Sequence, residues 1–111
     1  MGARYLVLFV ADPADDGHAD ALRDVARGVP GAGFFDDPMG GAQRTVGTYL
    51  RVDDDASHPA ARELIGRVAV VSATLAARIE IQLEERILGH LVAGQADARL
   101  ASELEAAFGA P

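Results

Sequence analysis

The sequence predicts one α+β domain of 111 residues, in which helices pack on one face of a sheet. Three observations predict it. Residues 6–10 are apolar without a break, which is typical of a strand buried on both faces. Residues 78–84 alternate polar with apolar side chains, which is typical of a strand buried on one face. Between them, two stretches repeat apolar residues at the spacing of an amphipathic helix.

The first strand is predicted over residues 4–11, and the first helix follows it directly. Asp12 fits the N-cap of that helix and Pro13 its first position, because these residue types suit those places. Gly28 fits the end of the helix. The helix then buries one apolar stripe, formed by Leu22, Val25, Ala26 and Val29.

Two strands are predicted next, over residues 33–37 and 44–52, with a glycine-rich turn at 38–43 between them. Alternation in the second strand places four side chains on its buried face: Val46, Thr48, Leu50 and Val52.

The second helix is predicted to begin with Ser57 or His58 as its cap and Pro59 in its first turn. Apolar residues between 64 and 75 then follow a helical stripe. The segment 68–72 is rich in β-branched residues, so a strand at this place is the competing prediction.

The fourth strand directs Ile79, Ile81 and Leu83 to one face. Its other face carries Arg78, Glu80, Gln82 and Glu84. Residues 86–94 fit neither pattern clearly, and residues 96–108 read as a closing helix. The predicted domain core therefore spans about 4–86, and a helical tail spans about 96–108. The tail has one apolar side, formed by Leu100, Leu104, Ala107 and Phe108.

The resulting order is β-α-β-β-α-β with an extra C-terminal helix. Two crossovers of the preferred hand place the strands in the order 4-1-3-2, which is a ferredoxin-like sandwich. Both helices then cover one face, and Tyr5, Val7 and Phe9 of the central first strand lie on the other. Such an uncovered apolar face is a candidate interface or ligand pocket. The C-terminal helix could cover part of it within the monomer, and a second copy of the sheet could cover more.

The segments "RYLVLFVADPADDGHADALRDV", "VPGAGFF" and "RTVGTYLRVDDDASHPAARELI" together resemble the dimeric α+β barrel superfamily, particularly its EthD-like members, over roughly residues 4–66. The resemblance implies a homodimer whose two sheets pack face to face around a small, fairly apolar ligand. Many such members place a histidine near the end of the first helix. This chain reads "DVARGVPGAG" there, so the resemblance assigns no catalytic residue.

Composition excludes several classes of partner. The net charge of −7 argues against nucleic acid and anionic membranes, and the absence of cysteine excludes disulfides and thiolate metal sites. The chain shows no signal peptide and no membrane-spanning run, so a soluble cytoplasmic protein is expected. The acidic stretches lack the ligand pattern of a calcium loop, and the glycine-rich turn lacks a following helix for phosphate. We therefore expect neither a metal nor a cofactor.

The candidate ligand-binding residues lie on the face that would line such a barrel. If the polar face of the fourth strand points into the barrel, Arg78 and Glu80 are expected beside Tyr49 and Arg51 of the third strand. His90 joins them because its neighbours are apolar. For the fourth strand, the competing interpretation is an edge strand whose charged face is solvated and discourages unwanted strand pairing. The other two histidines are explained by an acidic helix turn, for His18, and by a helix cap, for His58.

The leading hypothesis is a small homodimer, or a higher homo-oligomer, that binds a small organic molecule or serves as an accessory subunit. An enzyme is the alternative, as a cofactor-independent isomerase, cyclase or monooxygenase acting on an aromatic or polyketide-like substrate. It would need a buried His, Glu or Tyr with a partner in the cavity. A structural homo-oligomer joined through the C-terminal helix is the third class.

Overall fold

The computed structural model describes residues 4–38 and 43–109, and it shows an α+β domain with three helices on a six-stranded antiparallel sheet. The strands are β1 (Tyr5–Val10), β2 (Gly33–Asp37), β3 (Thr45–Arg51), β4 (Ile79–Leu83), β5 (Arg86–Val92) and β6 (Gln95–Ala96). The helices are α1 (Asp16–Gly28), α2 (His58–Leu75) and α3 (Ala98–Phe108), and a short 3-10 turn (Asp55–Ser57) precedes α2.

The strands lie in the order β2-β3-β1-β4-β5-β6, and every neighbouring pair is antiparallel. The first four follow the order expected from the sequence, with β1 between β3 and β4. The arrangement is consistent with a ferredoxin-like α+β fold. It differs from the predicted four-stranded sheet because β5 and β6 extend the sheet beyond β4.

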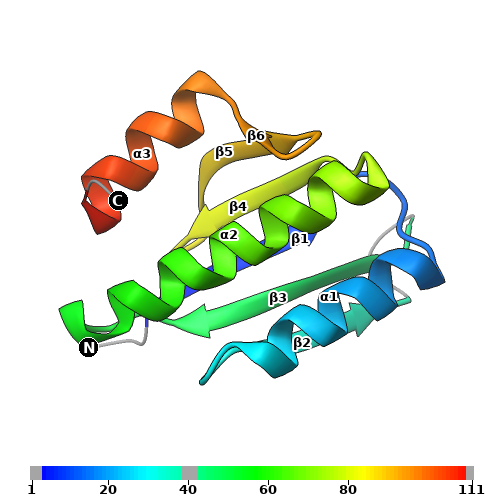
Figure 1. Ribbon diagram of the computed structural model, residues 1–111, viewed down its shortest axis with the longest axis horizontal. Coiled ribbons are helices and arrows are strands. Elements are labelled where there is room, and N and C mark those ends of the chain that lie inside the picture. Colours follow the sequence, from blue (N-terminus) through cyan, green and yellow to red (C-terminus); the bar gives the residue numbers. More distant parts are fainter. Residues whose placement is uncertain (1–3, 39–42, 110–111) are drawn as a thin grey trace.

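All three helices lie on one face of the sheet (Figure 1). That face holds the core, because alternate residues of β1, β3 and β4 pack against the apolar stripes of the helices. The predicted inward residues of β3 and β4 are buried, as are Leu22 and Ala26 of α1. The core also includes Leu88 and Leu91 of β5 and Leu100 and Phe108 of α3, so it continues past residue 86.

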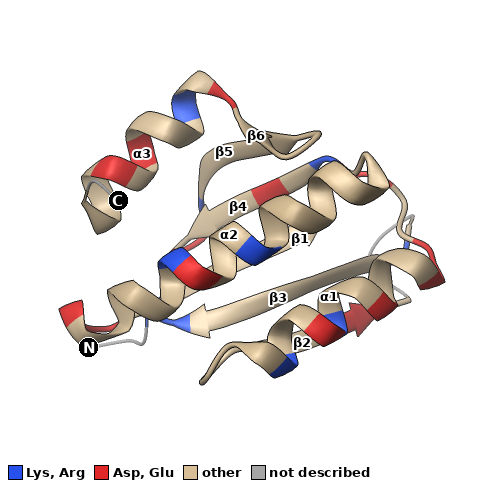
Figure 2. Cartoon of the chain, in the orientation of Figure 1, with Lys and Arg blue, Asp and Glu red and all other residues tan. Residues whose placement is uncertain are grey.

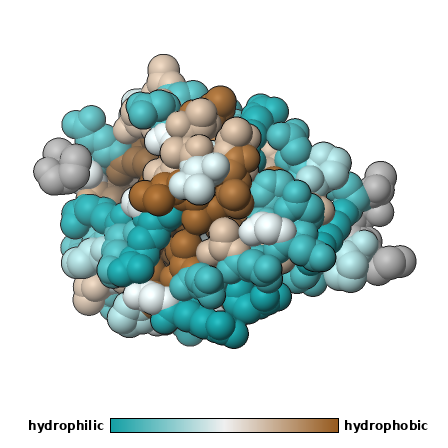
Figure 3. Space-filling model, turned by 45° about the vertical axis from the view of Figure 1, so that its right-hand side comes forward, coloured by the Kyte–Doolittle hydropathy of each residue, from teal (hydrophilic) through white to brown (hydrophobic). Residues whose placement is uncertain are grey.

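The outer sides of the helices carry charges of both signs (Figure 2). On α1, Arg23 pairs with Asp20 at 3.1 Å, and on α2, Arg67 pairs with Glu63 at the same distance. Seen from the side turned forward in Figure 3, apolar surface gathers in a band within a mostly hydrophilic exterior. None of the three helices within the described residues combines the length and apolar character that a membrane-crossing helix needs.

The C-terminal helix does not cover the open face, contrary to one alternative drawn from the sequence. Gly89 of β5 pairs with Ile81, whose side chain is in the core, and a Cβ on Gly89 would meet Leu100 of α3. Helix α3 therefore packs on the same face as α2. The opposite face of the sheet stays uncovered within the described chain.

The first helix begins later than predicted. Asp15, not Asp12, is its N-cap, and Pro13 precedes the helix. The Asp15 carboxylate accepts a hydrogen bond from the backbone N–H of His18, and the His18 ring accepts one from the backbone N–H of Asp15. This reciprocal pair caps the helix, with histidine in the place usually taken by Glu or Gln.

Residues 68–72 are helical, so the competing strand prediction is wrong. Val68 and Ser72 are buried one turn apart, and Ser72 explains the C-terminal end of α2. Its hydroxyl donates to the carbonyl of Ala77 at 2.6 Å and accepts from the backbone N–H of Gly94 at 3.0 Å. Most of the predicted turn at 38–43 lies outside the described residues.

Candidate functional site: the open face of the sheet

The face opposite the helices is organised in cross-strand rows, because paired residues of neighbouring strands point the same way. One row runs Gly33–Tyr49–Val7–Gln82–Ile87 across the strands β2, β3, β1, β4 and β5. The next row runs Phe35–Gly47–Phe9–Glu80–His90. Aromatic and apolar side chains thus occupy the side near β2 and β3, and the side near β4 and β5 carries polar side chains together with Ile87.

Two glycines allow the aromatic rings to lie down on the sheet. The ring of Tyr49 lies over Gly33, where an added Cβ would overlap it. The ring of Phe35 lies over Gly47, with its Cζ 2.7 Å from the place a Cβ would take. A side chain at either glycine would push these rings away, so the flat arrangement depends on both.

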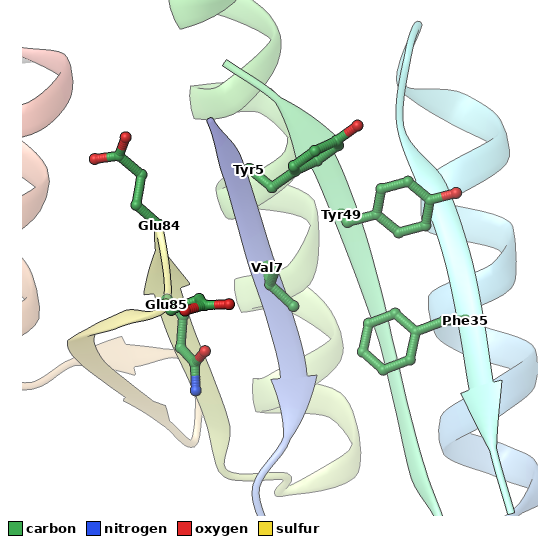
Figure 4. Close-up of a pocket in the computed structure, with 7 residues that line it drawn as sticks. Tyr5, Val7, Phe35, Tyr49, Glu84 and Glu85 are labelled. Carbon is green, nitrogen blue, oxygen red and sulfur yellow. The ribbon is translucent and has the colours of Figure 1, made fainter. Parts of the chain in front are cut away.

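A hollow of about 610 Å³ opens on this face. It is lined by Tyr5, Val7, Phe35, Tyr49, Gln82, Glu84 and Glu85. The close-up in Figure 4 looks onto the hollow with helices behind the strands. Val7 lies in its middle, the rings of Tyr49 and Phe35 lie over β2 and β3 on one side, and the carboxylate of Glu85 points toward Val7 from the other. Tyr5 and Tyr49 meet edge to face, with their ring centroids 6.3 Å apart.

One end of the hollow is bordered by ion pairs. Arg4 pairs with Glu84 at 3.1 Å, and the Arg51 guanidinium pairs with Asp53. The pKa of Asp53 is lowered, first by the backbone N–H of Arg4 and next by Arg51. The pKa of Arg51 is raised by the same carboxylate. All of these groups are solvent-exposed, so their pairing stabilises the chain little and leaves them available to exchange partners.

At the other side of the face, Glu80 and His90 form a half-buried pair. The Nε2 atom of His90 lies 3.2 Å from Oε1 of Glu80, and the amide of Gln82 donates to Oε2 of Glu80 at 2.6 Å. The Nδ1 atom of His90 lies 3.7 Å from the carboxylate of Asp97. Carboxylate and imidazole are the groups that transfer protons near neutral pH. Here they are engaged mainly with each other, and they tie β4 to β5.

Of the five predicted ligand-binding residues, Tyr49 alone lines the hollow, and three others lie elsewhere on this face. Tyr49 lines the hollow, Arg51 stands in the row of Tyr5 at its edge, and Glu80 and His90 form the neighbouring pair. Arg78 is exposed directly before β4, and it does not line the hollow. Sequence reasoning missed Phe35 and Glu85 as lining residues, because only the strand register places them beside Val7.

The other two histidines have separate surroundings. His18 caps α1, and the ring of His58 packs edge to face on Phe108, with centroids 5.2 Å apart. Across the described residues, no group of three or more His, Asp or Glu side chains is arranged to hold a metal ion.

A second hollow, of about 400 Å³, lies between α2 and α3 on the helix side. Ile65, Leu104 and Phe108 make it apolar. Comparisons with protein-family models, with curated proteins and with solved structures find no match to this chain.

Proposed function

We propose that the protein is a homodimer of the dimeric α+β barrel type, in which two copies pack their open sheet faces together and enclose a small organic molecule. The single observation that carries this proposal is the open face itself. It presents Tyr5 and Tyr49, in contact with each other and 42% and 39% exposed, in a hollow that no described segment of the chain covers. Contiguous exposed apolar side chains of this size mark an interface or a ligand site.

A second copy suits this face because its charges are self-complementary. Arg51 and Glu84 flank Tyr5 in one row, on opposite sides of β1. In a closed dimer each patch meets its own copy. A two-fold axis between the faces and parallel to the strands reverses the row, so that Arg51 lies over Glu84 of the second copy. The same rotation brings the aromatic side near β2 and β3 over Ile87 and His90 of the second copy.

The first experiment is native mass spectrometry of the wild-type chain and two matched variants. Val7→Asp places a charge in the middle of the face and is expected to give monomers. Val70→Asp makes the same change on the outer side of α2, where Val70 is 64% exposed, and is expected to leave the dimer intact. The wild type should be a dimer with extra ligand mass. A monomeric wild type overturns the proposal, and so does a Val7→Asp variant that stays as dimeric as the wild type.

A charge exchange tests the orientation and does not depend on how Val7→Asp folds. Arg51→Glu and Glu84→Arg should each weaken the dimer, since each places like charges opposite one another. The double variant restores opposite charges and should recover most of the lost affinity. Sedimentation equilibrium measures the dimer constant of all four chains. If the double variant dimerises no more tightly than the single variant with the lower dimer affinity, this orientation is contradicted.

Proton transfer is the second candidate function, and the half-buried pair of Glu80 and His90 favours it. The pair lies one row from the hollow, so a ligand there could receive a proton from the imidazole if the contact with Glu80 opens. The test is to incubate the ligand found in the dimer with wild type and His90→Gln. Conversion by the wild type alone supports an enzyme, and conversion by neither supports a binding protein.

A further inference from the structure

We propose that the hollow on the open face binds an organic cation, such as an ammonium group with small alkyl substituents. This inference rests on the proposed function, because it names the ligand class for the same face. It joins two features of the hollow: three aromatic rings on one side and an uncompensated carboxylate on the other.

The rings supply a wall that attracts cations. Tyr5, Phe35 and Tyr49 all line the hollow, and the glycines beneath two of them fix how these rings lie. The face of an aromatic ring is electronegative, and it attracts an ammonium group within about 6 Å of the ring centre. Tyr5 and Tyr49 meet at an interplanar angle of 66° on the same side of the hollow, and a neutral, polar ligand would gain less from these rings than a cation would.

The distance across the hollow suits a group of this size. The Tyr49 ring lies over Gly33 of β2 and the Phe35 ring over Gly47 of β3, whereas Glu85 follows β4, so that β1 and its Val7 lie between the rings and the carboxylate. Two strands of a sheet that have one strand between them are about 10 Å apart. A cation above Val7 would therefore lie about 5 Å from β3, on which the Phe35 ring rests, and about 5 Å from β4, which Glu85 follows.

The charges around the hollow leave one negative charge over. Its lining includes Glu84 and Glu85 and, within the described chain, no basic side chain. Arg4 compensates Glu84 and Arg51 compensates Asp53. Arg86, which follows Glu85, points its charge to Glu103 of α3 at 3.0 Å. Among the described residues none forms an ion pair with Glu85, so its charge is available to a ligand.

In a dimer, ion-pair partners could be exchanged between the two copies, but the excess of negative charge around the hollow would stay the same. Two basic groups, Arg4 and Arg51, face three acidic ones at this end of the face: Asp53, Glu84 and Glu85. Whichever partners pair across the two copies, each copy keeps one carboxylate in excess. A second copy would also remove water from the hollow, and this strengthens the attraction between the carboxylate and a bound cation.

The experiment compares two probes of the same shape by NMR titration of the full chain. One is choline, and the other is its neutral carbon isostere, in which a tert-butyl group replaces the trimethylammonium group. Choline is expected to bind about tenfold tighter than the isostere, and the signals of Tyr5 and Tyr49 should shift. Equal affinity for the two probes, or no binding of choline, overturns the inference.

Variants locate the site. Glu85→Gln should bring the two affinities close together, and Tyr49→Leu should weaken choline by about threefold to tenfold. Glu63→Gln on α2 removes the same charge away from the hollow and should leave the preference unchanged. If Glu63→Gln lowers the preference for choline over the isostere as much as Glu85→Gln does, the preference reflects the net charge of the protein, and the proposed location of the site in the hollow is wrong.

Native mass spectrometry of the same sample separates the two proposals. A dimer without preference for choline contradicts the cation site alone. A monomer that prefers choline contradicts the paired faces and keeps the cation site.

Discussion

The ring of Tyr49 occupies the space that a side chain on Gly33 would fill, so one residue of β2 shapes the wall of the hollow through its neighbour on β3. The same relationship joins Phe35 and Gly47 in the adjacent row. Together they make the aromatic side of the open face smooth. Rings that lie flat on glycines expose a broad surface to a ligand or a second copy, and they hold it ready before binding.

Substitution of the two glycines should have unequal effects on stability. In Gly33→Ala only the half-exposed Tyr49 ring must move, so the free energy of unfolding should fall by about 1 kcal/mol or less. In Gly47→Ala the new Cβ would also meet the backbone carbonyl of Leu8 at 2.5 Å, which cannot turn away. We expect a loss of about 2–3 kcal/mol there.

Chemical denaturation measures both variants, with Gly66→Ala as the control. An added Cβ at Gly66 of α2 meets nothing within 4 Å, so alanine should raise the free energy of unfolding by up to about 1 kcal/mol. Equal losses for Gly33→Ala and Gly47→Ala would show that the Leu8 carbonyl is not the limiting contact.

The Thr48→Val variant should be more stable than the wild type. Its hydroxyl is buried on the core side of β3, and no partner for it lies within the described part of the chain. Burial of a hydroxyl without a hydrogen bond costs about 1–3 kcal/mol. Thr48→Val keeps the shape and removes that cost, so the free energy of unfolding should rise by about 1 kcal/mol. A decrease in thermal unfolding temperature would show that the hydroxyl has a role that the fold alone does not reveal.

The sequence predicts β3 and β4 well because each of them has one buried face, and burial imposes the alternation that the pattern reports. It fails at β5 for two local reasons. The turn between β4 and β5 is Glu84–Glu85, with φ of 53° and 67°, where Asn-Gly would be the recognisable signal. Then β5 pairs Ile81 with Gly89 and Gln82 with Ile87, which leaves Leu88 as an extra residue and breaks its alternation.

The site is predictable only in part for the same reason. Tyr49 and Glu80 follow from the alternation within their own strands. Phe35 and Glu85 reach the hollow through the register between strands, which the sequence does not state. The start of α1 was also missed, because a histidine completes the cap of Asp15 where the usual pattern has Glu or Gln.

Glu85 should be a residue at which stability and binding conflict. A glutamate with positive φ is strained by about 1–2 kcal/mol, and asparagine tolerates this conformation better. Glu85→Asn should therefore raise the free energy of unfolding by roughly 0.5–1 kcal/mol while it weakens choline binding. Thermal unfolding and the NMR titration on one sample measure both. A variant that is less stable would mean that the carboxylate supports the turn and is not held there at a cost.

The acid sensitivity of the fold should depend on Asp97, the N-cap of α3. Its carboxylate accepts hydrogen bonds from the backbone N–H groups of Leu100 at 2.8 Å and His90 at 3.1 Å. These bonds lower the pKa of Asp97, the one from Leu100 most, although burial acts in the opposite direction. In the unfolded chain the pKa of an aspartate side chain is about 3.9. The folded state binds a proton on Asp97 less readily than the unfolded state does. The stabilisation is therefore complete above about pH 4, and it is lost as the pH falls through the pKa of Asp97 in the folded state.

Asp97→Asn separates charge from capping. Asparagine caps a helix about as well as aspartate, so stability at pH 7 should fall only slightly, whereas Asp97→Ala should lose about 1 kcal/mol or more. Below pH 4 the asparagine variant should lose stability less steeply than the wild type, because it has no carboxylate to protonate. Urea denaturation between pH 2.5 and 7 measures the slopes, with Asp24→Asn on the exposed side of α1 as the control. Identical slopes for Asp97→Asn and wild type would mean that the α3 cap has no part in acid unfolding.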